Sequence, residues 1–167
     1  MWIFMHIFLK NKFLYFGHYK IKCAIGKRGI SKNKKEGDLK TPRGIFRFET
    51  LFYRKDRLGN VKANIPKKII KKNMGWCDDP NSSKYNKLIE FPFKKSAERF
   101  FLKKKIYDLI LVLNYNRSPI IKNKGSAIFL HVSERHYKPT KGCISVNKKD
   151  FMKFLPLITR NTKIIIN

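Results

Sequence analysis

The sequence predicts a mainly β protein, a bent mixed β-sheet or sandwich with one or two helices. Short apolar runs dominate the chain, and turn signals separate them about every ten residues, as in all-β domains. The chain has 167 residues, of which 43% are hydrophobic, so it can form one domain with a real core. We expect an N-terminal apolar segment or first strand at residues 1–18, followed by the main part of the domain at residues 19–167.

The strands are expected in the following order. Residues 13–25 predict two strands around a turn at Gly17, and residues 44–52 alternate with the period of two that a strand requires. Residues 107–115 are continuously apolar, which predicts burial on both faces of the sheet. Three further strands are predicted at residues 126–132, 142–146 and 162–166.

Two segments have helical patterns. The first candidate is residues 92–104, with a start near residue 95. The second is residues 147–157, where Asn147 can serve as the N-cap and Asp150 suits the first turn. One apolar stripe supports this second helix, and it consists of Phe151, Phe154, Leu155 and Ile158.

The net charge of +28 suggests an anionic partner, but the kind of basic residue argues against nucleic acid. The chain has 30 Lys and 9 Arg, whereas base and phosphate recognition favours the bidentate Arg side chain. The lysines are also spread along the whole chain. We therefore do not expect a nucleic-acid partner, although any lysine-rich face would attract an anionic polymer or surface.

The chain begins with nine apolar residues, MWIFMHIFL, which end at Lys10. This segment is too short to span a bilayer, so no stable membrane span is expected. It also lacks the positive region and the cleavage site of an ordinary secretory signal. We expect a first strand or packing segment here, with an atypical export or membrane-contact segment as the alternative.

Three cysteines occur, Cys23, Cys77 and Cys143. They form no C-x-x-C pair, and no histidine lies at metal-ligand spacing, which argues against a zinc site and against a dense disulfide framework. A bridge between Cys23 and Cys77 is formally open.

The stretch GSAIFLHVSERHYKPTKGCIS, at residues 125–145, is the most informative part of the chain. His131 ends a buried strand, and Cys143 follows twelve residues later, directly after Gly142. Glycine permits a tight turn and a close approach of substrate, and the N–H groups of Gly142 and Cys143 would point outward as oxyanion donors. His131 would favour the nucleophilic thiolate of Cys143. Taken separately, the two residues read as a small buried thiol and a core histidine.

The whole pattern resembles the L,D-transpeptidase catalytic domain family (YkuD-like). His131 and the segment TKGCI at residues 140–144 match its signature of a strand-end His followed by Ser/Thr-x-Gly-Cys. The segment EGDLKTPRG at residues 36–44 matches a second, upstream block of the family. The segments GWCDDP at 75–80 and GSAIFLH at 125–131 resemble a compact, single-domain subgroup. The resemblance covers about residues 19–167, which we therefore expect to be the catalytic domain.

This resemblance implies a function. Cys143 would be the nucleophile, His131 the base and Gly142 part of the oxyanion site, with the peptidoglycan stem peptides of bacteria as substrates. The enzyme would cleave the diaminopimelate–D-alanine bond through a Cys143 thioester and transfer the acyl group to an amine or to water, with no metal or other cofactor. The periplasm or cell envelope is the expected location, and the cytoplasm is the alternative. The residues expected to contact substrate are Thr140, Lys141, Ser126 and Trp76.

Some alternatives stay open at this stage. His136 is a rival base in a polar loop, and Cys77 is a rival nucleophile whose thiolate Asp78 and Asp79 would disfavour. Asp38 is expected to orient the turn at residues 41–42 rather than to take part in chemistry. Lys141 and Ser145 stand where many relatives have His and Arg, so the group that orients His131 is not identified. The alternative function is a catalytically silent basic module that binds anionic cell-wall polymer or nucleic acid.

Overall fold

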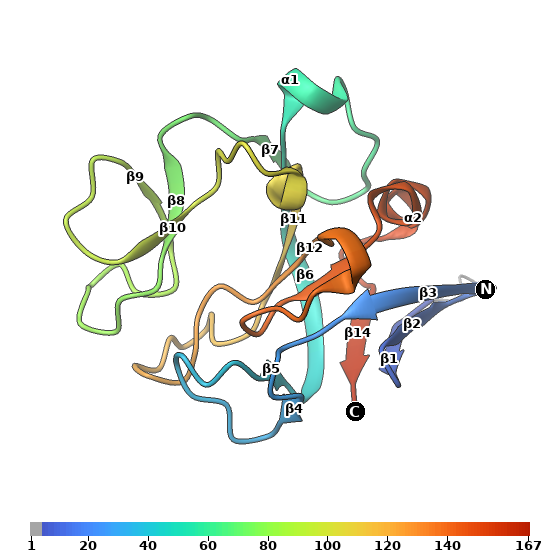
Figure 1. The fold of residues 1–167 in the computed structure, drawn as a ribbon, viewed down its shortest axis with the longest axis horizontal. Coiled ribbons are helices and arrows are strands. Elements are labelled where there is room, and N and C mark those ends of the chain that lie inside the picture. The colour runs from blue at the N-terminus through green and yellow to red at the C-terminus, as the bar shows by residue number, and fades with distance from the viewer. Residues whose placement is uncertain (1–4) are drawn as a thin grey trace.

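The computed structural model describes residues 5–167, and a single large sheet dominates this part of the chain (Figure 1). The strands of this sheet, in spatial order, are β11 (Leu109–Leu113), β12 (Phe129–Val132), β13 (Ile144–Val146), β3 (Tyr19–Ala24), β2 (Phe13–Phe16), β1 (Ile7–Lys10), β14 (Lys163–Ile166), β6 (Gly44–Tyr53) and β7 (Lys67–Ile69). All the strands predicted from the sequence are present in it. β7 is an additional strand that the sequence did not predict.

The long strand β6 closes this sheet on itself. Its first residues pair with β14, and its later residues pair with β11, the strand at the far end of the spatial order. Most pairings are antiparallel, but β1 pairs with β14, β6 with β7 and β12 with β13 in parallel. The predicted bent mixed sheet is therefore confirmed.

The main core lies inside the curved sheet and follows from the alternation of side chains along its strands. In β1, Ile7 and Leu9 are buried while Phe8 and Lys10 are exposed. β11 is buried at every position, as its continuous apolar composition predicted. The first strands of the chain thus belong to the same core as β14 at its end. Residues 1–4 of the predicted first strand lie outside the described residues, and the division of the chain after residue 18 stays a prediction.

A smaller three-stranded sheet stands to one side of the large one, at the left of Figure 1. It consists of β8 (Met74–Cys77), β9 (Leu88–Glu90) and β10 (Ala97–Arg99). A second apolar cluster, which includes Trp76, Phe100, Phe129 and Cys143, lies between this sheet and the large one. Elsewhere, β4 (Ile30–Ser31) and β5 (Thr41–Pro42) form a two-stranded sheet.

The prediction of a helix at residues 92–104 is wrong. The segment instead contains β10, which pairs with β8 so that Glu98 lies opposite Trp76. Phe100, directly after β10, is fully buried against the rings of Phe52, Trp76 and Phe129. Strand pairing and this aromatic contact outweigh a weak local helical preference.

The second predicted helix is confirmed as α2 (Lys148–Phe154), followed by a 3₁₀ turn at Leu155–Leu157. Asn147 caps it, since its side chain accepts a hydrogen bond of 2.8 Å from the N–H of Lys149. All four residues of the predicted stripe are buried. The short helix α1 (Lys55–Leu58) has no counterpart in the prediction.

The structure also bears on the possible disulfide bridge and on a possible membrane span. All three cysteines are free thiols, so Cys23 and Cys77 form no bridge. Residues 5–167 contain no helix that is both long and apolar enough to cross a membrane.

Candidate active site

Cys143 lies at the end of a turn that only glycine can make without strain. Gly142 has a φ of 148°, and a Cβ added to it would lie 2.9 Å from the carbonyl oxygen of Lys40. Within the turn, the Thr140 hydroxyl donates to the Cys143 carbonyl oxygen at 2.5 Å and accepts from the Gly142 N–H at 3.1 Å. Thr140 therefore supports the turn with its hydroxyl. The expected outward orientation of the Gly142 N–H is not observed, because Thr140 already accepts from it.

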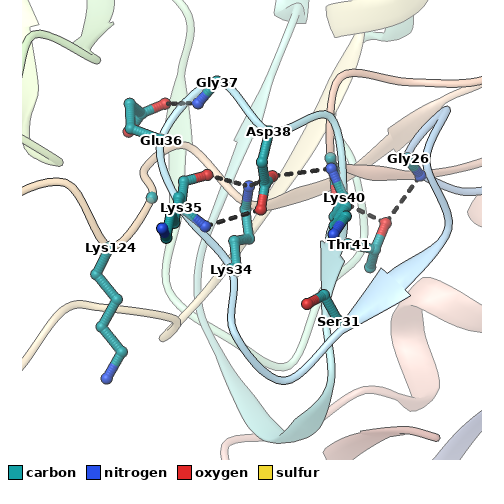
Figure 2. Close-up of polar contacts among 12 residues, drawn as sticks. Gly26, Ser31, Lys34, Lys35, Glu36, Gly37, Asp38, Lys40, Thr41 and Lys124 are labelled. Atoms are coloured by element: carbon teal, nitrogen blue, oxygen red, sulfur yellow. Dashed lines mark hydrogen bonds and ion pairs between the residues drawn. The ribbon is translucent and has the colours of Figure 1, made fainter.

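The upstream motif supports this turn directly. Thr41 is fully buried, and its hydroxyl donates to the Gly142 carbonyl oxygen at 2.9 Å. The Thr41 hydroxyl oxygen itself accepts a hydrogen bond of 2.8 Å from the N–H of Gly26 (Figure 2). One side chain thus joins the two sequence motifs, although 101 residues separate Thr41 from Gly142.

The Cys143 thiol is buried among backbone groups of the strand that carries His131. Its Sγ donates to the Ala127 carbonyl oxygen at 3.1 Å and accepts from the Phe129 N–H at 3.4 Å. Burial raises the pKa of the Cys143 thiol to about 12, and the carboxylate of Glu98 acts in the same direction. The Phe129 N–H and the Lys34 ammonium oppose this increase.

His131 lies on β12 and is buried as well. Its Nδ1 is 2.9 Å from the carbonyl oxygen of Val132, which only accepts, so Nδ1 carries the proton of the neutral ring. The Tyr107 ring meets the imidazole edge-on, with centroids 5.4 Å apart. The sequence analysis did not identify a group that orients His131, and in the structure backbone carbonyl groups, those of Val132 and Ile106, act on its ring.

The two candidate reacting groups lie on the same face of the sheet. β12 and β13 are parallel neighbours in which His131 is opposite Ser145. Side chains alternate along a strand, so Cys143, two residues before Ser145, points to the side of the sheet on which His131 lies. Both side chains line one cavity of about 480 Å³.

Burial favours the neutral form of both groups. Burial lowers the pKa of His131 to about 4, although the carbonyl groups of Val132 and Ile106 and the charge of Glu134 act in the opposite direction. With the thiol pKa near 12, a thiolate–imidazolium pair is disfavoured at neutral pH. The proton of Cys143 would therefore move to His131 as the sulfur attacks rather than beforehand.

A second cavity of about 200 Å³ also reaches Cys143. Glu98, Lys141 and Cys143 line both cavities, so the two meet at the sulfur. Lys141, one of the predicted substrate contacts, is exposed at this junction. Cys143 therefore lies where the two cavities adjoin.

Glu98 is a residue of this site that the sequence analysis missed. Its carboxylate accepts a hydrogen bond of 2.6 Å from the Tyr107 hydroxyl, and Tyr107 in turn contacts His131. Burial raises the pKa of Glu98, although the hydrogen bond from Tyr107 acts against it. The sequence analysis missed Glu98 because it predicted a helix at residues 92–104. Glu98 comes close to Cys143 only because β10 pairs with β8, with Glu98 opposite Trp76.

Ser126 and Trp76, which were also predicted to contact substrate, lie in different places relative to the two cavities. Ser126 is buried and lines the smaller cavity, and its hydroxyl has no hydrogen-bond partner among residues 5–167. Trp76 is only 2% exposed, its indole N–H donates to Asn86 at 2.9 Å, and it lines neither cavity at Cys143. Trp76 therefore packs behind Phe129, with which its ring makes an edge contact.

The rival residues lie elsewhere. Cys77 is fully buried in β8 and lines neither cavity, although Asp78 lines the smaller one. His136 lines a different cavity together with Cys23. Asp38 accepts hydrogen bonds from the N–H groups of Lys35 and Lys40, so it orders the loop before Thr41 as expected. Among the described residues, no group of three or more His, Cys, Asp or Glu side chains could hold a metal ion.

A family model described as the L,D-transpeptidase catalytic domain (YkuD) matches residues 5–166, which is nearly the whole chain. No curated protein matches the sequence.

Two solved structures are similar to this chain. L,D-transpeptidase 1 of Mycobacterium tuberculosis shares 8% identity at a TM-score of 0.46. An L,D-transpeptidase from Mycobacterium smegmatis shares 12% identity at a TM-score of 0.43. Each comparison covers 98% of this chain and 58% of the mycobacterial protein, so this chain spans less than two thirds of either one.

Proposed function

Because the chain belongs to the L,D-transpeptidase catalytic domain family, we propose that it is a cysteine acyltransferase that acts on peptidoglycan stem peptides in the bacterial cell envelope. The observation that carries the proposal is the shared cavity of Cys143 and His131 on adjacent parallel strands. The turn around Gly142 and its support by Thr41 give the cysteine a fixed position.

In the proposed reaction, Cys143 Sγ attacks the carbonyl carbon of the diaminopimelate residue in the stem peptide. The thiol proton passes to Nε2 of His131, whose Nδ1 stays bonded to the Val132 carbonyl. His131 then protonates the nitrogen of D-alanine as the amide bond breaks, which leaves a thioester on Cys143. The N–H of Cys143 is the backbone donor proposed for the oxyanion, since that of Gly142 is occupied.

An amine from a second stem peptide then attacks the thioester, loses a proton to His131 and forms the cross-link, which frees the thiol. With water as acceptor the same steps give a carboxypeptidase. The two cavities that meet at Cys143 support separate approaches for donor and acceptor. We place Lys141 and Ser126 in contact with substrate, because both line the cavities, and Thr140 in the support of the turn. Trp76 supports the site from behind Phe129.

The test is incubation of the purified protein with muropeptides, with the products identified by mass spectrometry. We expect D-alanine release and either cross-linked or shortened stems, and a loss of turnover of at least ~10³-fold in Cys143→Ala. Cys77→Ala is the matched control, since it removes a second buried thiol that lies outside both cavities, and it should retain activity.

Turnover by Cys143→Ala near the wild-type rate would contradict the proposal. The alternative, a silent basic module, has a different signature. It predicts no turnover by the wild type, together with salt-sensitive retention on sacculi that Cys143→Ala preserves.

A further inference from the structure

Lys34 is the only buried lysine of residues 5–167, in a chain with 30 lysines. It lies in the loop between β4 and β5, and only 7% of its surface is exposed. Lysine is rarely buried to this extent without a specific partner, because an ammonium group loses its hydration when it leaves water.

The loop holds the ammonium group through two acceptors. Lys34 Nζ donates to Asp38 Oδ1 at 2.7 Å and to the Lys35 carbonyl oxygen at 3.2 Å (Figure 2). The N–H groups of Lys35 and Lys40 donate to the same Asp38 carboxylate, at 2.7 and 2.9 Å. Asp38 thereby fixes both the loop and the ammonium group. An ammonium has three N–H donors, so one of them has no acceptor among the described residues.

The free side of Lys34 faces the candidate active site. Lys34, Ser126, Gly142 and Cys143 all line the cavity of about 200 Å³. Lys34 Nζ lies 3.5 Å from the position that a Cβ of Gly142 would occupy, so the absence of that side chain leaves the ammonium beside the peptide that leads to Cys143. A positive charge, held by Asp38, is therefore fixed in the wall of the cavity that Cys143 also lines.

This placement points to an anionic ligand. A charged donor in a site with little water favours an anionic oxygen over a neutral one. The need for such a donor is greater because the Gly142 N–H already donates to Thr140. Ser126, with its unpartnered hydroxyl, provides a second polar group on the same cavity wall.

We propose that Lys34, held by Asp38, forms an anion subsite beside Cys143 that binds an anionic oxygen of the acyl donor. Two oxygens of the substrate have this chemistry, the oxyanion formed on the attacked carbonyl and the carboxylate of the departing amino acid. The identity of the donor rests on the proposed function, whereas the anion subsite itself does not.

The first experiment needs no turnover. Cys143 is alkylated with iodoacetate or with iodoacetamide, and the modified peptide is quantified by mass spectrometry. We expect the ratio of the two rates to be higher for wild-type Cys143 than for a free thiol such as N-acetylcysteine, and to fall roughly tenfold in Lys34→Met. Lys34→Arg, which keeps the charge, should keep most of the ratio.

Lys35→Met is the matched control. It removes the same charge from the neighbouring residue, whose exposed side chain lies outside both cavities, so it corrects for the general attraction of a +28 chain to anions. The iodoacetamide rate reports whether the site is intact in each variant. The inference is overturned if the wild-type ratio does not exceed that of the free thiol, or if Lys34→Met and Lys35→Met lower it equally.

The second experiment separates the two oxygens. Stem peptides that end in a carboxylate or in a carboxamide are compared as donors for wild type and Lys34→Met. If Lys34 binds the carboxylate, the variant raises KM for the first peptide only, whereas if it binds the oxyanion, kcat falls for both. Either result supports the subsite, and unchanged constants for both peptides contradict it. A wild type without turnover would refute the proposed function while leaving the alkylation result valid.

Discussion

Replacement of Thr41 by valine tests whether the upstream motif supports the cysteine turn. Valine has nearly the same shape as threonine but has no hydroxyl, so Thr41→Val removes the bonds to the Gly26 N–H and the Gly142 carbonyl without opening a cavity. Thr41 is fully buried, so water cannot replace either bond. Each orphaned buried polar group costs about 1–3 kcal/mol, so the two together give a loss of about 2–6 kcal/mol.

The free energy of unfolding measured by urea denaturation checks this estimate. Thr41→Ser is the matched control, because it keeps the hydroxyl and loses only a methyl group, at a cost of about 1 kcal/mol. We also expect the iodoacetamide rate at Cys143 to change in Thr41→Val and not in Thr41→Ser, since Gly142 loses a support. A Thr41→Val protein within about 0.5 kcal/mol of wild type, with unchanged Cys143 reactivity, would refute the reasoning.

Two more predictions concern the turn and the base. His131 has its pKa lowered to about 4 in the folded state from 6.5, so below pH 6.5 the unfolded chain binds the additional proton. The free energy of unfolding of the wild type should therefore fall by roughly 3 kcal/mol between pH 6.5 and 4 relative to that of His131→Gln, as measured by urea denaturation at each pH. The same pH dependence in both proteins would contradict this. Gly142→Ala should lower stability by about 1–3 kcal/mol and reduce muropeptide turnover, because the new Cβ meets the Lys40 carbonyl at 2.9 Å. Gly59→Ala, where a Cβ has open space, is the control for the positive φ alone, and equal losses in the two variants would exclude the contact as the cause.

The sequence was sufficient for every strand of the large sheet except β7, because the burial of the other strands follows local patterns whereas β7 is exposed at all three of its positions. Residues 107–115 are apolar at almost every position, and β11 is indeed buried on both faces. Asn147 and the stripe of α2 were readable for the same reason, since a cap and a helical face are defined within a few residues.

The remaining parts of the fold and the site depend on contacts between distant segments. β10 forms because β8, about twenty residues earlier, offers an edge and Phe100 has an aromatic pocket, and neither fact is visible in residues 92–104. Glu98 reached the site only through that pairing. In the sequence nothing distinguishes Lys34 from the other lysines, of which the chain has 30 in all. Its special position depends on contacts with Asp38 and Gly142 that only the structure shows. The hydrogen bond between His131 and the Val132 carbonyl could not be predicted from residue types, because every residue has a backbone carbonyl.

The charge near Cys143 differs from the charge of the whole chain. The protein carries 39 basic and 11 acidic residues, yet the smaller cavity is lined by two lysines, Lys34 and Lys141, and three acids, Glu36, Asp78 and Glu98. The general positive charge acts at long range and would hold the protein near an anionic wall polymer. The smaller cavity instead presents charges of both signs to a ligand. The long-range charge of the chain and the local charge around Cys143 thus depend on different residues.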